Sequence, residues 1–491
     1  MVLRLIDKKQ LPRLSACLLF ACTPLIIMLV LSLLSGQNMF LSKPVFNDEI
    51  GYWRELFSIS HCGFGFGSTG GLPGKSAPIG PLESHGLGPL AAWLWYVLLF
   101  PVGESAIVIA NFLLLTAAIA LFCLLVRPEA KTALLLAVFT LLFPPLVRYI
   151  NVSMMEIPCY AGGIVYMAFL YRYQKKPTLL RLFWVLAAGG YCALLRLSNV
   201  VLFIPAIFIL AGNKFRPRLF LLLAVYAAGV LALNRFVNAF ISPYPDFMST
   251  LSYCSSYGEV LSMVLQNALK NLGRLFDPTS DNSLPQAFAR YQYIFLVALL
   301  LMLGFFRRNG NGRLRPGWNW DWVGILGIAA GCLFLVIFLY DVFDWRDYRT
   351  LTPTMYFSVS WLLLHREKCA AGYRRGLAGI ILFGMLMAPE AYIHVSTDNR
   401  FFDTDSMVTD CSALFDSQPC TLALYGDSYP LALAMSVPPQ AGISAGLYEG
   451  YDLSRGIDYI LRCPGDPEPP ADLFRPVGQM ENWGLLYERI N

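Results

Sequence analysis

The chain has 491 residues, of which 56% are hydrophobic and only 14% are charged. An ordinary soluble domain carries about 25% charged residues, so this composition excludes a water-soluble globule and indicates that lipid solvates most of the chain. The formal net charge is only +5, and the 37 Lys and Arg residues stand in short clusters between apolar runs. That distribution orients a polytopic membrane protein in the lipid bilayer and does not favour nucleic-acid binding.

Eleven apolar runs can cross a bilayer if kinks or polar flanks complete the shorter ones. In chain order they are 14–34, 105–126, 132–147, 157–171, 182–195, 197–212, 217–233, 291–306, 322–340, 350–364 and 376–393. The first run has no small-residue cleavage site, which predicts an uncleaved anchor and not a signal peptide. The expected fold class is therefore α-helical and polytopic, with about eleven transmembrane helices.

The positive-inside rule assigns the two sides of the membrane. With a cytoplasmic N-terminus, the cytoplasmic segments hold 21 of the 37 Lys and Arg residues, provided that the run 88–103 does not cross. That run, GPLAAWLWYVLLFPVG, is therefore expected to be an interfacial juxtamembrane helix anchored by Trp and Tyr. We expect a multi-pass protein of a bacterial inner or plasma membrane.

Two regions are expected along the chain. The first is a transmembrane domain, 1–395, with a long first extracytoplasmic loop at 35–104, and the second is a small extracytoplasmic domain, 396–491. Within the second, strands bounded by Gly, Pro and Asp clusters are expected at 420–426, 457–463 and 484–490. A helix between the first two would make this domain a small α/β module.

Ionisable residues gather where the spans end on the outer face. The segment FNDEIGYW follows the first span, and helical spacing places Asp48 and Tyr52 on one side while Glu49 points about 100° away. The two carboxylates are therefore expected to have different roles. A charged side chain this close to the membrane is costly unless it is paired with an opposite charge, solvated in a cavity or required for function. The other charged residues of this face include Arg148, Glu156, Arg196, Arg346 and Arg349.

In order and spacing, these features resemble the GT-C superfamily of integral-membrane glycosyltransferases, in particular the protein O-mannosyltransferases and the aminoarabinose transferases of lipid A. The first span is followed by an Asp-Glu-x-x-Tyr motif at residues 48–52 and by the segment ESHGLGPLAAWLWYVLLFPVGES. A later outer turn carries Glu156, and a Gly-containing span ends in Arg196. An Arg-x-x-x-Pro sequence beginning at Arg349 then opens an inward-going span.

The resemblance covers roughly residues 14–365, and it departs from the family pattern at two places. The family's second acid is often Asp, whereas this chain has Glu156. The usual basic-Pro-Pro-Leu segment is replaced by SHGLGPL, which leaves the donor-phosphate contacts of that segment unassigned.

The resemblance implies inverting transfer of a sugar from a polyprenyl-phosphate donor to a hydroxyl of a glycan, lipid or protein acceptor on the extracytoplasmic face. Such a hydroxyl needs a carboxylate as general base, for which Asp48 is the candidate. The leaving lipid phosphate needs arginine, and the candidates are Arg349, Arg196 and Arg148 in that order. Glu156 would orient the acceptor or tune Asp48 through like-charge proximity.

The remaining candidates are less specific. Glu49 is a second catalytic candidate of open role, and the further substrate-binding candidates are Tyr52, His85 and Arg346. The four histidines lack metal-ligand spacing, and acids in separate turns are weak evidence for a metal, so no cofactor is expected, although a divalent metal is left open.

Structural roles and other functions compete with this interpretation. The acids could cap helices, Arg349 and Arg346 could pair with Asp344 and Asp347 in their own loop, and Arg196 could snorkel to the interface. The alternative function is a transporter or lipid-linked glycan flippase, but transporters usually show two matching hydropathy halves. An O-antigen ligase or polymerase would place its long polar loop late in the chain, and a non-catalytic scaffold is a further alternative.

Overall fold

The computed structural model describes residues 11–45, 47–62, 87–88, 103–239, 247, 251, 253–277, 284–308, 314–340, 347–368, 371–398, 400–401, 420–425, 441–447, 457–462, 465, 467–480 and 484–490. The interfacial helix expected at 88–103 lies outside these residues except for its two end positions.

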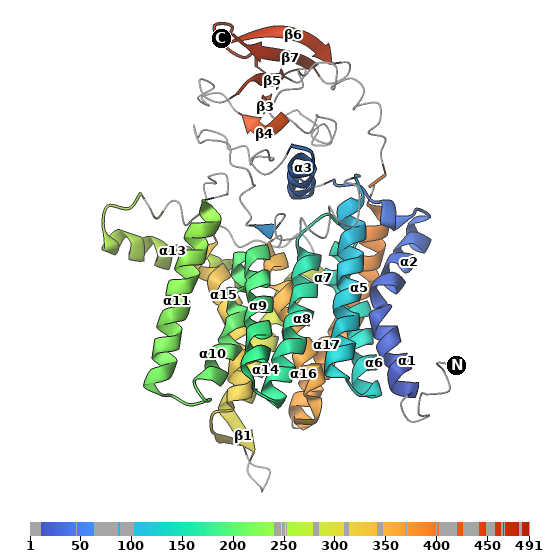
Figure 1. The fold of residues 1–491 in the computed structure, drawn as a ribbon, viewed down its shortest axis with the longest axis vertical. Coiled ribbons are helices and arrows are strands. Elements are labelled where there is room, and N and C mark those ends of the chain that lie inside the picture. Colours follow the sequence, from blue (N-terminus) through green and yellow to red (C-terminus); the bar gives the residue numbers. More distant parts are fainter. Residues whose placement is uncertain are drawn as a thin grey trace.

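Most of the described chain is a bundle of helices that run side by side (Figure 1). In chain order the helical segments, with η marking 3-10 helices, are α1 (Leu11–Ala21), α2 (Thr23–Ser35), η2 (Met39–Leu41), α3 (Asn47–Cys62), α5 (Ala106–Val126), α6 (Ala130–Leu141), α7 (Pro144–Tyr149), α8 (Glu156–Lys175), α9 (Leu179–Leu195), η3 (Leu197–Phe203), α10 (Ile204–Leu210), α11 (Pro217–Asn238), α13 (Tyr257–Phe276), α14 (Leu284–Phe305), α15 (Trp320–Leu339), η5 (Asp347–Thr350), α16 (Thr352–Leu364), η6 (Arg366–Lys368) and α17 (Ala371–Thr397). Each of the eleven predicted apolar runs contains helix, which confirms the helical fold class.

Among the described residues, four helices are long and apolar enough to cross a membrane, and the bent pair α1–α2 would make a fifth. Other apolar helices, including α6 and α9, are shorter than a straight span. The chain is thus a multi-pass membrane protein, while the count of eleven spans stays a prediction. Proline explains the bend of 50° between α1 and α2, because Pro24 has no N–H for the carbonyl of Phe20. The Thr23 hydroxyl donates to that carbonyl instead, at 2.8 Å.

Glycines allow the helices to approach closely around the site. A Cβ atom on Gly162 of α8 would lie 2.6 Å from Cys192 Sγ of α9, and one on Gly327 of α15 would lie 2.5 Å from a side-chain carbon of Ile204. Only glycine permits these two approaches without a shift of the neighbouring helix.

The two ends of the bundle differ. α3 and the C-terminal sheet lie at one end, whereas α1 begins at the opposite end, where the β1–β2 hairpin (Phe306–Arg308 paired with Leu314–Pro316) also lies (Figure 1). This agrees with the predicted grouping of the segments by side. Which end faces the cytoplasm stays a prediction.

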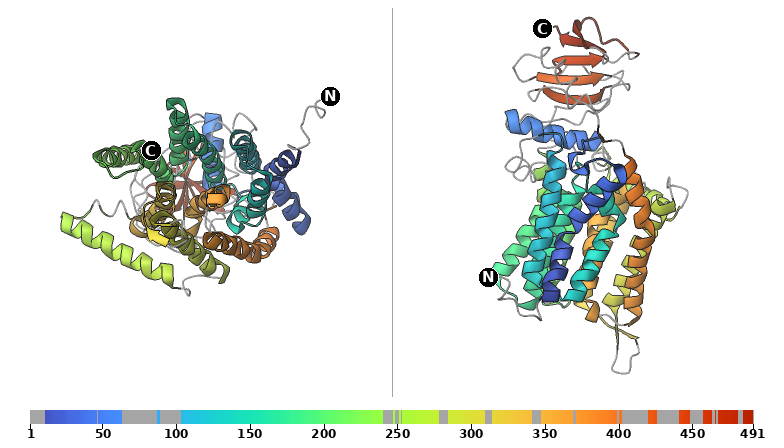
Figure 2. Two further views of the ribbon diagram at one scale, coloured as in Figure 1. Left: turned by 90° about the horizontal axis from the view of Figure 1, so that it is seen from below. Right: turned by 90° about the vertical axis from the view of Figure 1, so that its right-hand side faces the viewer.

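Helix α3 lies across one end of the bundle, beneath the C-terminal sheet (Figure 2). Three apolar residues of α3 that share one face at helical spacing, Ile50, Trp53 and Leu56, are buried. Arg54 and Glu55 are buried as well, so α3 is enclosed on its polar side too. A helix covered on all sides holds its side chains in fixed directions, which matters for the acids at its start.

The C-terminal region forms a five-stranded mixed sheet of order β4-β3-β5-β7-β6. Its strands are β3 (Cys420–Tyr425), β4 (Ala441–Leu447), β5 (Tyr459–Arg462), β6 (Phe474–Met480) and β7 (Gly484–Arg489). The three predicted strands correspond to β3, β5 and β7, and the sequence did not reveal β4 and β6. β3 pairs in parallel with both β4 and β5, so connections must cross the sheet. The predicted helix and the boundary at 395/396 stay predictions.

Candidate active site

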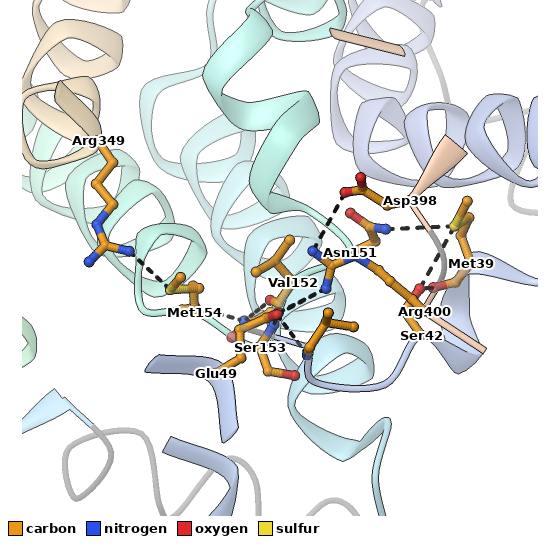
Figure 3. Close-up of polar contacts among 12 residues, drawn as sticks. Met39, Ser42, Glu49, Asn151, Val152, Ser153, Met154, Arg349, Asp398 and Arg400 are labelled. Atoms are coloured by element: carbon orange, nitrogen blue, oxygen red, sulfur yellow. Dashed lines mark hydrogen bonds and ion pairs between the residues drawn. The ribbon is translucent and has the colours of Figure 1, made fainter. Parts of the chain in front are cut away.

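The two adjacent carboxylates at the start of α3 have different partners. Arg349 Nη2 donates to Asp48 Oδ2 at 2.5 Å. Arg400 Nη1 instead lies 3.0 and 3.1 Å from the two oxygens of Glu49 (Figure 3). Successive residues of a helix are rotated by about 100°, so helical geometry explains why the two acids diverge.

Arg349 connects Asp48 to a second acid, Glu156. Arg349 Nε lies 3.8 Å from Glu156 Oε1, and Arg196 Nη2 donates to the same oxygen at 3.1 Å. Asp48, Arg349, Glu156 and Arg196 therefore form a continuous series of contacts, which we call the charge network. Its members come from α3, η5, the first residue of α8 and the residue after α9. Four segments that are distant in sequence thus meet at one end of the bundle.

The turn that precedes Glu156 is held from α5. Asn111 Nδ2 donates to the carbonyls of Val152 and Met154, at 3.4 and 3.1 Å. The Met154 sulfur in turn accepts a weak hydrogen bond from Arg349 Nη1 at 3.5 Å (Figure 3). These contacts fix the position of the turn, and with it the start of α8 that carries Glu156.

Most of the charge network is removed from water. The side chain of Glu156 is 0% exposed and that of Arg196 is 12% exposed, while Asp48 and Arg349 are 15% and 20% exposed. Burial by itself lowers the pKa of Arg349, but Glu156 and then Asp48 outweigh it and raise the pKa above that of an ordinary arginine. Arg349 is therefore charged, and in this low-dielectric setting its charge acts more strongly than in water.

The charge network has unused hydrogen-bonding capacity. Glu156 Oε2, Arg196 Nη1 and Arg349 Nε are buried and have no hydrogen-bond partner in the described structure. Leaving such atoms unpaired is costly, which favours a bound group that supplies partners. Two guanidinium donors beside a carboxylate acceptor suit a ligand that carries both an anion and hydroxyl groups. Within the described residues, no three or more His, Cys, Asp or Glu side chains are grouped to hold a metal ion.

Tyr52 lies next to the charge network, one helical turn after Asp48. It is only 2% exposed, and it is close enough to Arg196 to act on that side chain electrostatically. The neighbouring Trp53 donates from Nε1 to the carbonyl of Gly103 at 3.1 Å, which ties α3 to the segment before α5. The predicted placement of Tyr52 and Asp48 on one side of a helix agrees with this arrangement.

Arg148 does not join the charge network. Its Nη2 atom lies 2.9 and 2.6 Å from the two carboxylate oxygens of Glu390 in α17. His85 and Arg346 lie outside the described residues. Sequence reasoning missed both Glu390 and Arg400. A carboxylate inside an apolar run signals a paired charge and could have identified Glu390, whereas no pattern distinguished Arg400.

A cavity among the described residues lies away from the charge network. It has a volume of about 340 Å³ and is lined by Tyr171, Gln174, Lys175, Ile209, Asn213, Leu364, His365 and Glu367. α8 begins at Glu156 and ends at Lys175, so this cavity lies at the opposite end of that helix from the charge network.

No protein-family model matches the chain, and no curated protein matches its sequence. Among solved structures, the chain is similar to ArnT from Cupriavidus metallidurans bound to undecaprenyl phosphate, with a TM-score of 0.46 and 12% identity over 96% of this chain and 98% of that chain. The same protein in the apo state gives a TM-score of 0.41 at 12% identity, over 96% and 97%. The Archaeoglobus fulgidus oligosaccharyltransferase in complex with Zn and sulfate gives 0.45 at 10% identity, over 92% of this chain and 68% of that chain.

ArnT and the oligosaccharyltransferase are both GT-C membrane glycosyltransferases, the superfamily that the sequence resembles. Since all three TM-scores lie below 0.5, these similarities carry no argument about activity. The charge network is therefore the feature that bears on function.

Proposed function

We propose that the chain is a membrane glycosyltransferase that moves a sugar from a polyprenyl-phosphate donor to an acceptor hydroxyl on the extracytoplasmic face. Asp48 is the general base, and Arg349 and Arg196 bind the donor phosphate. The observation that carries this proposal is that Asp48, Arg349, Glu156 and Arg196 meet within contact distances of 2.5 to 3.8 Å.

The reaction is an inverting displacement at the anomeric carbon. The acceptor hydroxyl transfers its proton to the Asp48 carboxylate while its oxygen forms the new bond to that carbon. The bond from the anomeric carbon to the phosphate oxygen breaks, and the electron pair leaves with the polyprenyl phosphate. The charge that develops on the leaving phosphate is stabilised by Arg349 and Arg196, which are held in place before the reaction.

Arg349 has a double role in this scheme. A carboxylate that accepts a hydrogen bond from arginine is stabilised in its charged form, so the contact with Arg349 makes Asp48 a weaker base. A donor phosphate that binds Arg349 would compete with Asp48 for the guanidinium and so return basicity to the carboxylate. Glu156, between the two arginines, is placed to accept a hydrogen bond from a sugar or acceptor hydroxyl through Oε2.

The arrangement favours transfer over transport. The four charged residues lie at the start of α3, at the start of α8 and in the connections between helices, and not midway along a span. Transporters place their substrate and coupling-ion sites near the bilayer midplane, in broken helices.

The test measures the binding of undecaprenyl phosphate to the purified protein in lipid nanodiscs, since a polyprenyl phosphate is the product common to every such donor. We expect the wild type to bind it and Arg349→Gln to bind it at least about tenfold more weakly, because one charge-assisted contact is lost. The matched control is Arg475→Gln, which breaks an exposed 2.8 Å pair with Glu488 in the C-terminal sheet and should bind like the wild type.

Transfer is then assayed by following cleavage of the sugar–phosphate bond in a panel of labelled polyprenyl-phosphate sugars, with membrane extract as the source of acceptor. Absence of binding by the wild type, or equal binding by Arg349→Gln, would contradict the proposal. Movement of intact labelled lipid across vesicles without bond cleavage would support a flippase instead.

A further inference from the structure

Glu49 is held by donors from three separate segments of the chain. Besides Arg400, the backbone N–H of Ser153 donates to Glu49 Oε1 at 2.7 Å and that of Val45 donates to Oε2 at 3.0 Å. The carboxylate is 0% exposed. Glu49 therefore ties the start of α3 to the linker before it, to the turn before α8 and to the first residues after α17.

Arg400 is held equally firmly. Its side chain is 2% exposed, and Nη2 lies 3.8 Å from Asp398 Oδ2. Its carbonyl accepts a hydrogen bond from the N–H of Lys43 at 3.1 Å. The segment after α17 thus contacts the linker between α2 and α3 through its main chain. It contacts α3 itself through the side chain of Arg400, which reaches Glu49 (Figure 3).

A buried ion pair is a poor source of net stability, because removing two charges from water costs several kcal/mol per ion. The pair instead helps to set the relative positions of the chain segments around it. Glu49 is adjacent to Asp48 in α3. It accepts a hydrogen bond from Ser153, which lies three residues before Glu156. Ser153 is also next to Met154, whose sulfur contacts Arg349. Glu49, whose carboxylate Arg400 holds in place, therefore fixes the distance between the two segments that carry the acids of the charge network.

We infer that the Glu49–Arg400 ion pair positions Asp48 for catalysis, so that Arg400, in the segment after the last bundle helix, is a positioning residue of the active site. Neither side chain touches the reacting atoms in this scheme. The inference rests on the proposed function for its catalytic consequence, while its geometric part can be tested without any substrate.

The geometric test is hydrogen–deuterium exchange of the protein in nanodiscs. In Glu49→Gln, the amides of residues 47–53 and of the turn 150–155 should exchange faster together, because one carboxylate holds both segments. The matched control is Glu390→Gln, which removes the partner of Arg148 at the same end of the bundle and should leave these two segments unchanged. Unchanged exchange in Glu49→Gln would overturn the inference, whether or not the protein proves to be a glycosyltransferase.

The kinetic test separates positioning from a purely structural role. A misplacement of about 1 Å can lower catalysis by roughly 100-fold, so kcat per folded molecule should fall by about that factor in Glu49→Gln and Arg400→Gln. The Kd for undecaprenyl phosphate should stay within about threefold of the wild type, because Arg349 and Arg196 remain. Arg400→Lys should recover most of kcat, since a single nitrogen of Arg400 makes both contacts to Glu49.

Arg400→Lys also serves where the neutral variants fold poorly, since it keeps the charge pair. Full kcat in every folded variant of the pair would overturn the positioning role, as would a loss of phosphate affinity equal to the loss of kcat. A wild type that neither binds undecaprenyl phosphate nor cleaves a donor would instead overturn the proposed function, with the exchange data still deciding the geometric claim.

Discussion

Asp48→Asn should lower transfer and tighten phosphate binding at the same time. The substitution keeps the size of the side chain but removes the base, and loss of a general base typically costs about 10²- to 10⁴-fold in rate. It also removes the anionic partner of Arg349. A hydrogen bond to a charged group contributes about 1.5–3 kcal/mol, and the 15% and 20% exposure of the pair favours the lower end of that range. Releasing this contact should strengthen binding of undecaprenyl phosphate by up to roughly tenfold.

The same variant should remain folded. Arg349 keeps Glu156 at 3.8 Å, so Asp48→Asn does not leave an unpaired buried charge, which would cost about 3–5 kcal/mol. The assay combines three measurements in nanodiscs: the Tm, the Kd for undecaprenyl phosphate and kcat for donor cleavage. Glu390→Gln controls for the loss of a carboxylate at the same end of the bundle. Full transfer by Asp48→Asn, or weaker phosphate binding, would refute the reasoning.

Three further predictions follow from the packing and the charges. Arg349→Lys should keep the charge but bind undecaprenyl phosphate at least about tenfold more weakly, as a titration would measure. The three guanidinium nitrogens of Arg349 face three different partners, and one ammonium group cannot replace them. Glu156→Gln should lower stability by about 3 kcal/mol, since it removes a fully buried acid that lies between two arginines of only 12% and 20% exposure, and a Tm unchanged from the wild type would contradict this. Gly162→Ala should cost about 1–3 kcal/mol through its contact with Cys192, whereas Gly163→Ala, with open space at its Cβ position, should be neutral or stabilising in the same thermal assay.

Sequence reasoning works well where one physical rule dominates. The apolar runs became helices because lipid-exposed backbone must satisfy its own hydrogen bonds. The divergence of Asp48 and Glu49 followed from the 100° step of a helix alone. The grouping of Asp48, Glu156, Arg196 and Arg349 at one face came from counting which loops share a side. In the structure these four residues are in contact, although Asp48 and Arg349 are 301 positions apart.

The sequence could not show how those residues pair. From the sequence, Asp344 and Asp347 in the same loop are candidate partners of Arg349. The contacts of Arg349 with Asp48 and Glu156 follow only from the tertiary structure, in which η5 and the turn before α8 lie together. Arg400 stands in a polar region with no periodicity or motif, and only the tertiary structure brings it to Glu49. The strands β4 and β6 were missed because both contain glycine or proline, which lowers strand propensity.

The charge balance of the network explains why Arg349 should contact both the base and the phosphate. Two acids and two arginines give a formal charge of zero, and a phosphodiester donor adds one negative charge. During the proposed reaction Asp48 gains a proton and becomes neutral, while the leaving phosphate gains one negative charge. The total charge is constant, and one unit moves from Asp48 to the phosphate. An arginine that already lies 2.5 Å from Asp48 can stabilise the charge at both positions with little movement, so the low-dielectric site need not reorganise as the bond breaks.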